Sequence, residues 1–360
     1  YSNRLYSNIN KRIKLIMAYT TINKSTDYFN TKLWNGNSST QAITGVGFSP
    51  DLVWGKQRTS TENHQLLDVI RGANNILVSN NDTGNTPDTN ILNSFDSDGF
   101  TLGNQNQLND TGATYVSWNW KANGQGSSNT DGSINTTYTS ANTTSGFSIS
   151  TYTGTGANAT VGHGLGATPK MFIVKRLNST GAFRTYVEPL GNLGQLALNA
   201  TDEVSDVASM WNSTSPTNST ISIGTHAGVN ASGGTYVAYC FASVQGFSKI
   251  GSYVGNGQGN ANGTFVYTGF KPAFVLIKNA DFDSNWNNFT GDIPGYNQIN
   301  VILQPNRDAA ENGTFAFDML SNGFKHRSGD VMDRNGDTHI YMAIAEAPLV
   351  GTNNVPATAR

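Results

Sequence analysis

The sequence is poor in cysteine, in charge and in long apolar runs, and each shortage removes a class of protein. The one cysteine, Cys240, excludes an intramolecular disulfide framework and a cysteine-rich metal site. Only 13% of the residues are charged and the net charge is -2. Beyond residues 1–16 the chain therefore lacks the concentrated basic surface that neutralises nucleic acid phosphates. No apolar run approaches the roughly 18 residues needed to cross a bilayer, so we expect neither nucleic acid binding nor membrane insertion.

The chain also lacks the short motifs of common enzyme families. It contains no G-x-S-x-G elbow, no H-E-x-x-H pair and no phosphate loop ending in Gly-Lys-Ser/Thr. Its histidines share no ligand spacing. The sequence therefore predicts no catalytic residue, no cofactor and no metal site, and the protein is expected not to be an enzyme.

What the chain does contain is a pattern that occurs three times. Residues 47–56, 166–175 and 269–278 each place a glycine, a proline, an apolar run and a lysine in the same order. A second apolar strand closes each copy, at 114–120, 235–241 and 338–344. The distance from the proline (Pro50, Pro169, Pro272) to the threonine that begins the closing strand differs by two residues at most. A repeated unit of about 100 residues is therefore the basis of the fold prediction.

Each copy consists of short apolar segments separated by Gly, Asn and Asp, which is typical of antiparallel sheets. We predict an all-β protein with three tandem antiparallel β-sandwich modules, jelly-roll or lectin-like. The predicted divisions are a basic arm at 1–17, module 1 at 18–122, a Gly/Asn/Ser/Thr linker at 123–145, module 2 at 146–245, module 3 at 246–351 and a tail at 352–360.

The closing strands alternate in a way that predicts which face is buried. In the first copy Val116, Trp118 and Trp120 share one face, which we assign to the core, and Ser117 and Asn119 share the other. Truncating Trp118 should then cost about 3–5 kcal/mol, whereas Asn119→Ala should be near neutral.

One polar pattern recurs with the repeat. A lysine ends each strand that follows the proline, and an acid follows before the next glycine turn. Two interpretations remain open, a ligand-binding dyad or, as we favour, a strand-end lysine that reaches the surface beside its acid. The pairs are Lys56 with Asp68, Lys175 with Glu188, and Lys278 with Asp292.

Three tryptophans are the candidate glycan contacts. Trp34, Trp211 and Trp286 fall outside the closing strands and could stack on sugar rings, although an aromatic residue in an all-β chain is more often part of the core.

Several stretches resemble a known group of proteins. Residues 95–103, 161–165, 249–257, 345–348 and 356–360 are similar to a repeated module in virion structural and tail-fibre-like proteins of marine bacteriophages. The resemblance covers about residues 17–360. It implies a tail fibre, a tail appendage or a head decoration on the outer surface of a phage particle, without catalytic residues to carry over.

The expected function is accordingly that of a non-enzymatic virion scaffold or adhesin. The alternatives are a carbohydrate-binding receptor adhesin and, less favoured, a glycan depolymerase, since the acids are scattered along the chain. The expected partners are other virion proteins, further copies of the chain in an oligomer or lattice, and a host surface glycan. Residues 1–17 contain four basic residues and no acid, and we expect this arm to lie across a partner.

Overall fold

The computed structural model describes residues 19–313 and 315–351. Strands make up 41% of the described residues and helices 6%, and every pairing between the strands named below is antiparallel. The all-β prediction is therefore confirmed. The predicted arm at 1–17 and tail at 352–360 lie outside the described residues.

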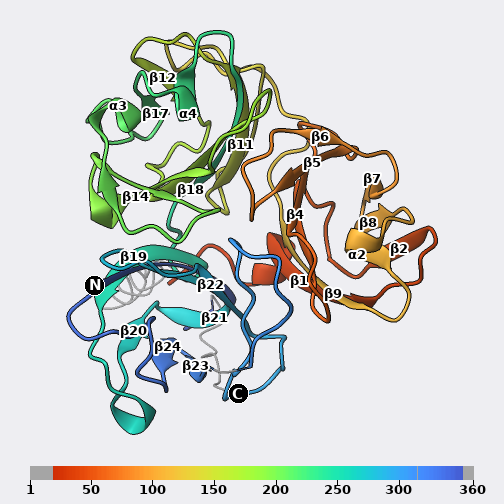
Figure 1. Ribbon diagram of the computed structural model, residues 1–360, viewed down its shortest axis with the longest axis vertical. Helices are drawn as coiled ribbons and strands as arrows, with labels where there is room; N and C mark the ends of the chain where they lie inside the picture. Colours follow the sequence, from red (N-terminus) through yellow and green to blue (C-terminus); the bar gives the residue numbers. More distant parts are fainter. Residues whose placement is uncertain (1–18, 314, 352–360) are drawn as a thin grey trace, which may run out of the picture.

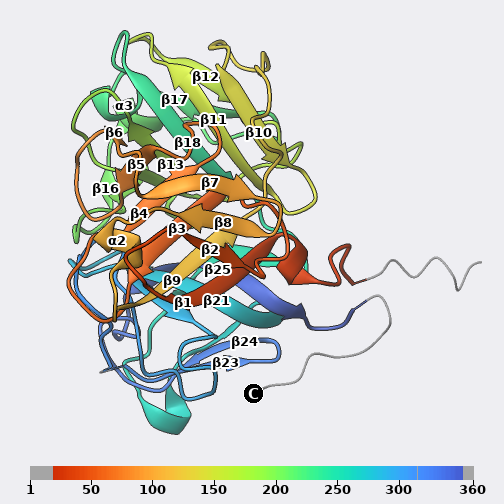
Figure 2. The same ribbon diagram turned by 90° about the vertical axis from the view of Figure 1, so that its right-hand side faces the viewer.

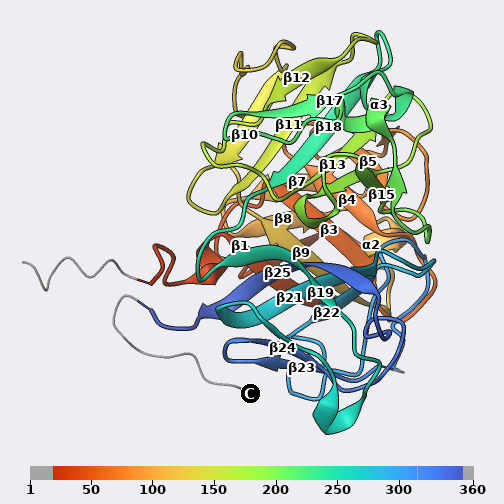
Figure 3. The ribbon, with the colours of Figure 1, turned by 90° about the vertical axis from the view of Figure 1, so that its left-hand side faces the viewer.

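Three lobes surround a common centre (Figure 1). Lobe 1 comprises residues 24–122, lobe 2 residues 123–245 and lobe 3 residues 246–351. Each lobe contains a larger and a smaller sheet. The smaller sheets lie on the outside, as Figure 2 shows for β2, β7 and β8 and Figure 3 for β23 and β24.

In lobe 1 the larger sheet has the order β1-β9-β3-β4-β5-β6 and the smaller one the order β2-β8-β7. The strands are β1 (Phe29–Asn35), β2 (Gln41–Thr44), β3 (Leu52–Gln57), β4 (Gln65–Asp68), β5 (Asn75–Val78), β6 (Thr86–Pro87), β7 (Leu92–Asp96), β8 (Gly99–Leu102) and β9 (Thr114–Trp120). Two helical turns, η1 (Ser25–Asp27) and α2 (Asn106–Asn109), accompany them.

In lobe 2 the larger sheet has the order β10-β11-β18-β13-β14-β15-β16, and β12 pairs with β17. The strands are β10 (Tyr138–Asn142), β11 (Phe147–Thr153), β12 (Ala159–Gly162), β13 (Met171–Arg176), β14 (Arg184–Val187), β15 (Gly194–Ala197), β16 (Ser205–Asp206), β17 (Thr220–Ile223) and β18 (Thr235–Phe241). The short helices are η2 (Glu188–Leu190), α3 (Ala208–Trp211) and α4 (Ala227–Asn230).

In lobe 3 the larger sheet has the order β19-β25-β21-β22 and the smaller one the order β20-β24-β23. The strands are β19 (Ser248–Val254), β20 (Phe265–Tyr267), β21 (Phe270–Asn279), β22 (Asn287–Thr290), β23 (Phe317–Leu320), β24 (Gly323–His326) and β25 (Thr338–Pro348), with the turn η3 (Asn260–Asn262).

The larger sheets share one strand order and one register. The closing strand lies between the first strand and the strand after the proline in every lobe, as β1-β9-β3, β11-β18-β13 and β19-β25-β21. The second residue after each proline pairs with the seventh residue of the closing strand: Leu52 with Trp120, Met171 with Phe241, and Phe274 with Ile344. Within these three shared strands, the local difference is that β21 begins before Pro272 and changes register around it, while the outer strands of the sheets differ in number.

Both faces of the closing strands are buried. Their larger side chains join a core shared by all three lobes, where the Trp120 ring lies 5.8 Å from Phe274 of lobe 3 and 6.3 Å from Phe147 of lobe 2. Their other face belongs to the separate core of each lobe. Asn119 is 0% exposed, and its Nδ2 donates to Asn30 O at 2.9 Å. The assignment of only one face of this strand to the core is therefore wrong, because Asn119 is buried as well and one of its amide hydrogens is bound by a backbone carbonyl.

The range 123–145 is not a simple linker, contrary to the sequence prediction. It contains β10, which pairs with β11, and Ile134 forms a bridge with Val161. Its hydroxyl groups bond to one another inside lobe 2, with 2.9 Å between Thr136 Oγ1 and Thr139 Oγ1. Short polar side chains can be buried when they are paired in this way, and composition alone suggested solvent exposure.

Candidate functional site at the junctions between lobes

The three candidate glycan-contact tryptophans are buried. Trp34, Trp211 and Trp286 are 8%, 1% and 0% exposed. Their indole N–H groups donate to Leu108 O, Gly194 O and Ala197 O at 3.0, 3.1 and 3.0 Å, respectively. The prediction that these residues stack on sugars is therefore wrong. An indole with a nearby carbonyl acceptor is satisfied inside a core, and sequence alone could not show those acceptors.

The three repeat lysines are equivalent and fully buried. Lys56, Lys175 and Lys278 pair in register with Val116, Val237 and Ile340 of the closing strands. Each lysine is 0% exposed. The expectation that they reach the surface is wrong, and the cause lies in the seven residues that follow each strand.

These seven residues form what we call the lysine loops, at 58–64, 177–183 and 280–286. Lys56 Nζ donates to Gln57 O at 2.6 Å and to Ser60 O at 3.4 Å. Lys278 Nζ donates to Asn279 O at 2.5 Å and to Phe282 O at 3.2 Å. Each of these two ammonium groups therefore binds the carbonyl of the residue that ends its strand and one carbonyl within its lysine loop.

In lobe 2 the same arrangement reaches into the neighbouring lobe. Lys175 Nζ donates to Gly181 O within its own loop and to Asp82 O of lobe 1 at 2.9 Å. Its ammonium also lies 4.8 Å from the centre of the Phe183 ring. Lys175 thus binds groups on both sides of the junction between lobes 1 and 2.

Burial lowers the pKa of all three lysines. Loss of hydration is the largest cause, and it brings the pKa of Lys56, Lys175 and Lys278 to about 8 each. Nearby carboxylates act in the opposite direction, Glu62 on Lys56 and Asp82 on Lys175. A lysine with this pKa can act as a base, but here its protons are directed at backbone carbonyls.

The predicted lysine–acid pairs do not form in lobes 1 and 2. Asp68 is bound to Arg71 and Glu188 to Lys170, at 2.6 and 2.9 Å. Asp292 lies exposed in the turn after β22. The hairpin register is the physical reason: Asp68 pairs with Leu52, four residues before Lys56. At about 3.3 Å per residue, lysine and acid stand at opposite ends of the hairpin, roughly 13 Å apart.

The lysine loops join the lobes in a closed cycle. The loop of lobe 1 meets lobe 3, where Glu62 N donates to Asp308 O at 2.9 Å and Arg58 forms an ion pair with Glu311. The loop of lobe 3 meets lobe 2, where Ser284 N donates to Thr201 O at 2.8 Å. The loop of lobe 2 meets lobe 1, where Gly181 N donates to Asp82 O at 2.8 Å. Each lobe thus uses its lysine loop to contact the next lobe, and the third contact returns to the first lobe, as in a ring of heterologous interfaces.

The closing strands make a second set of contacts in the same direction. Trp118 Nε1 donates to Thr290 Oγ1 of lobe 3 at 2.9 Å, and the Tyr239 hydroxyl donates to Asp68 Oδ2 of lobe 1 at 2.7 Å. At the junction between lobes 3 and 2, Met342 occupies the position of Trp118 and Tyr239, and Val187 the position of Thr290 and Asp68. Met342 and Val187 are both buried in the shared core. Two junctions are therefore polar at this point and one is apolar.

A polar cleft of about 350 Å³ lies between lobes 1 and 2, and Arg71 is its charged residue. The other lining residues are Asn75, Asn85, Leu177, Asn178 and Thr235. The guanidinium of Arg71 donates to Asp68, Asn75 O, Asn85 Oδ1, Leu66 O and the Tyr239 hydroxyl. These bonds use all five of its N–H groups, so Arg71 joins the two lobes and is not available to a ligand. The sequence analysis did not identify it, because only the fold brings its partners together.

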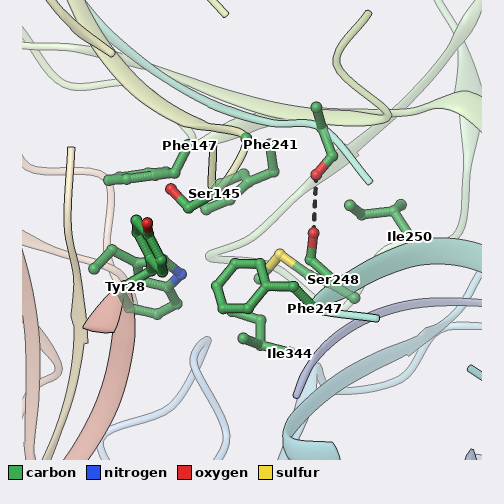
Figure 4. A pocket seen from close by; sticks show the side chains of 12 residues that line it. Tyr28, Ser145, Phe147, Phe241, Phe247, Ser248, Ile250 and Ile344 are labelled. Atoms are coloured by element: carbon green, nitrogen blue, oxygen red, sulfur yellow. Dashed lines mark hydrogen bonds between the residues drawn. The ribbon is translucent and has the colours of Figure 1, made fainter. Parts of the chain in front are cut away.

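An apolar pocket is lined by residues of all three lobes (Figure 4). Tyr28, Phe147, Phe241, Phe247 and Ile344 line it, and Ser248 Oγ donates to Ala242 O at 3.1 Å. Its free volume of about 10 Å³ is at most that of one water molecule. The pocket is therefore a packing defect of the shared core.

Within residues 19–313 and 315–351, no group of three or more His, Cys, Asp or Glu side chains could hold a metal ion. In the same part of the chain, no helix is long and apolar enough to cross a membrane.

The comparison with protein families identifies the whole three-lobed unit. A family described as a domain of unknown function, DUF7483, matches residues 24–348. The chain belongs to the DUF7483 family. The match begins just before η1 and ends at the last residue of β25, so the DUF7483 unit comprises all three lobes. The comparison with curated proteins finds no match.

Proposed function

We propose that this chain is a non-enzymatic structural protein on the outer surface of a bacteriophage particle, where it serves as a scaffold or adhesin in a tail fibre, tail appendage or head decoration. The sequence resemblance supplies the location. The observation that carries the structural role is the closed cycle of lysine loops, because it makes three lobes into one stiff body. Stiffness suits a part that must hold its shape outside a particle.

The same proposal includes the finer fold. Each lobe is an antiparallel β-sandwich module of about 100 residues, jelly-roll or lectin-like, and the three modules are tandem repeats. The shared strand order and the shared pairing of the residues after the prolines support this view. The shared core adds one feature to this view: apolar side chains of each module are buried against those of the other two modules.

Two of the scattered acids, Asp98 and Asp283, have structural roles. Asp98 accepts hydrogen bonds from the backbone N–H groups of Gly45 and Gly47 at 3.0 and 2.7 Å. Asp283 accepts from Glu203 N at 3.0 Å, across the junction between lobes 3 and 2. A glycosidase needs two carboxyl groups facing one bond of the substrate, whereas these two hold loops. This favours the scaffold or adhesin over the depolymerase.

The proposed partners are other virion proteins and further copies of this chain, and the basic segment 1–17 is the proposed contact. Removal of residues 1–16 should reduce incorporation into particles. Unchanged incorporation and an unchanged mass of the free protein would remove the segment from the proposal.

The location is tested on intact particles. Density-gradient-purified phage that encodes this chain should contain the protein by mass spectrometry, and antibodies raised against residues 19–351 should label the outside of unopened particles by immunogold electron microscopy. Absence from purified particles would refute the virion role. Release of reducing ends from a polysaccharide by the purified protein would instead support the depolymerase.

A further inference from the structure

Lobe 3 carries a pair of exposed aromatic side chains on its outer sheet. Phe265 and Tyr267 lie on the outward face of β20 and are 44% and 48% exposed, whereas Val266 between them is 7% exposed and belongs to the core of lobe 3. Alternate residues of a strand are about 7 Å apart, so the two rings form one apolar surface. Exposed apolar surface of this kind commonly marks a binding site.

The other lobes show that the fold does not require these rings. Val266 pairs with Phe324, as Ile43 pairs with Phe100 and Val161 with Ile221. The residues equivalent to Phe265 and Tyr267 are therefore Ala42 and Thr44 in lobe 1, and Thr160 and Gly162 in lobe 2. The same strand pairing forms there with small side chains. The strand pairing therefore does not require aromatic residues at these two positions, although the Tyr267 hydroxyl also lies 3.5 Å from the Tyr19 hydroxyl.

Neighbouring residues hold the two rings in place. The Phe265 ring lies over Gly323, because a Cβ atom at that glycine would stand 3.1 Å from Phe265 Cε2. Tyr267 has its carbonyl bound by Lys249 Nζ at 2.7 Å, and the same ammonium lies 5.5 Å from the centre of the Tyr267 ring. Rings fixed before binding lose little conformational entropy when a ligand stacks on them.

The aromatic pair has a cationic border. Lys325 is the register partner of Phe265, and its Nζ donates to Ala261 O at 2.7 Å. An ammonium carries three donors, so Lys325 and Lys249 can each bind an anionic oxygen in addition to these carbonyls. An acid on the same sheet, Asp318, is the register partner of Lys325 on β23, and its carboxylate forms an ion pair with Arg327 at 2.5 Å.

We propose that Phe265 and Tyr267 form a binding surface for an acidic polysaccharide. The apolar C–H faces of its sugar rings stack on the two aromatic rings, and its carboxylate or sulfate groups bind Lys249 and Lys325 through charge-assisted hydrogen bonds. Flanking cations make an acidic glycan the favoured ligand over a neutral one. This site does not depend on the virion location, since a purified protein would show it.

Binding is tested with full-length protein and immobilised alginate and chondroitin sulfate, with dextran as the neutral comparison. The matched variant is F265A/Y267T, which places the residues of lobe 1 at the equivalent positions and should fold normally. We expect it to lose at least about tenfold in affinity. Y296A, which removes a 65% exposed aromatic side chain elsewhere in lobe 3, should bind like the wild type. K325Q should weaken binding to both acidic glycans and reduce its dependence on salt.

Three results would overturn the proposal: no binding of the wild type to either acidic glycan, equal binding by wild type and F265A/Y267T, or stronger binding to dextran. A fourth, a change in the molar mass of F265A/Y267T by light scattering with unchanged glycan binding, would assign the rings to contacts between copies of the chain. Immunogold labelling of particles answers the virion question separately, so failure of one proposal leaves the other standing.

Discussion

The hydroxyl of Tyr239 and the guanidinium of Arg71 bind the same carboxylate oxygen, Asp68 Oδ2, at 2.7 and 2.6 Å. Arg71 and Asp68 belong to lobe 1 and Tyr239 to lobe 2, and all three are almost completely buried. A buried carboxylate is stable only when donors surround it. This contact therefore makes the stability of lobe 1 depend on the presence of lobe 2.

Removal of the Tyr239 hydroxyl tests that dependence. Tyr239→Phe should lower the free energy of unfolding by about 1.5–3 kcal/mol, the usual contribution of a hydrogen bond to a charged group. Urea denaturation followed by tryptophan fluorescence measures the change. Tyr138, which is 38% exposed, supplies the control, and Tyr138→Phe should be near neutral. Equal effects of the two changes would contradict the role of this contact.

Both faces of β9 should be sensitive to truncation. Trp118→Ala should cost about 3–5 kcal/mol, because it empties part of the shared core. Asn119→Ala should cost about 0.5–1.5 kcal/mol, since it removes a hydrogen bond to the half-buried Asn30 carbonyl. Chemical denaturation of each single variant gives both values. If Asn119→Ala leaves the free energy of unfolding unchanged, only the Trp118 face of this strand contributes to stability.

The buried lysines should make stability rise with pH in a defined window. Their pKa is about 8 in the folded protein and about 10.5 when unfolded. Between these values the unfolded chain holds protons that the folded chain has released, so the free energy of unfolding increases with pH. The contribution is complete above pH 10.5 and is lost as the pH falls through 8.

Lys175→Met isolates this effect, because subtraction of its stability profile from that of the wild type removes the titration of all other groups. The difference between the two profiles should grow in favour of the wild type from pH 8 to pH 10. Tyr115 and Tyr341, whose pKa burial raises to about 12, act in the opposite direction above pH 10. Parallel profiles from pH 8 to pH 10 would show that Lys175 titrates normally.

The three lobes should unfold together. Residues 123–245 expressed alone would expose Ile149, Ile173 and Phe241, which are buried in the shared core. We expect this fragment to aggregate or to bind a hydrophobic dye, whereas residues 19–351 should give one calorimetric transition with equal calorimetric and van't Hoff enthalpies. Separate transitions for the lobes, or a soluble and well-folded fragment, would argue for independent domains.

The sequence predicted the features that depend on local pattern. The prolines mark the strands and the threonines mark the closing strands, and the structure adds that Leu52, Met171 and Phe274 pair in the same register. The pattern could not show what the large side chains of β9 contact. The apolar alternation in the sequence is the same whether that face of the strand packs against the second sheet of its own lobe or against another lobe.

The site predictions were weaker for a related reason. Lys56 and Asp68 recur with the repeat, but sequence distance suggested proximity where the hairpin separates them. The buried positions of Trp211 and Asn119 depend on backbone carbonyls supplied by other segments. The sequence does not show which backbone carbonyls will lie beside a given side chain. Conversely, Phe265 and Tyr267 could have been found by asking where one copy of the repeat differs from the other two.

The cycle of lysine loops closes within a single polypeptide, and this has a consequence for binding. A ring of three separate subunits dissociates on dilution, and it presents three identical surfaces. Here the connections between the lobes are covalent, so the ring persists at any concentration. Because each lobe has its own segment of the sequence, one of them can have aromatic side chains while the others keep small ones. The proposed polysaccharide site accordingly occurs once in each three-lobed body.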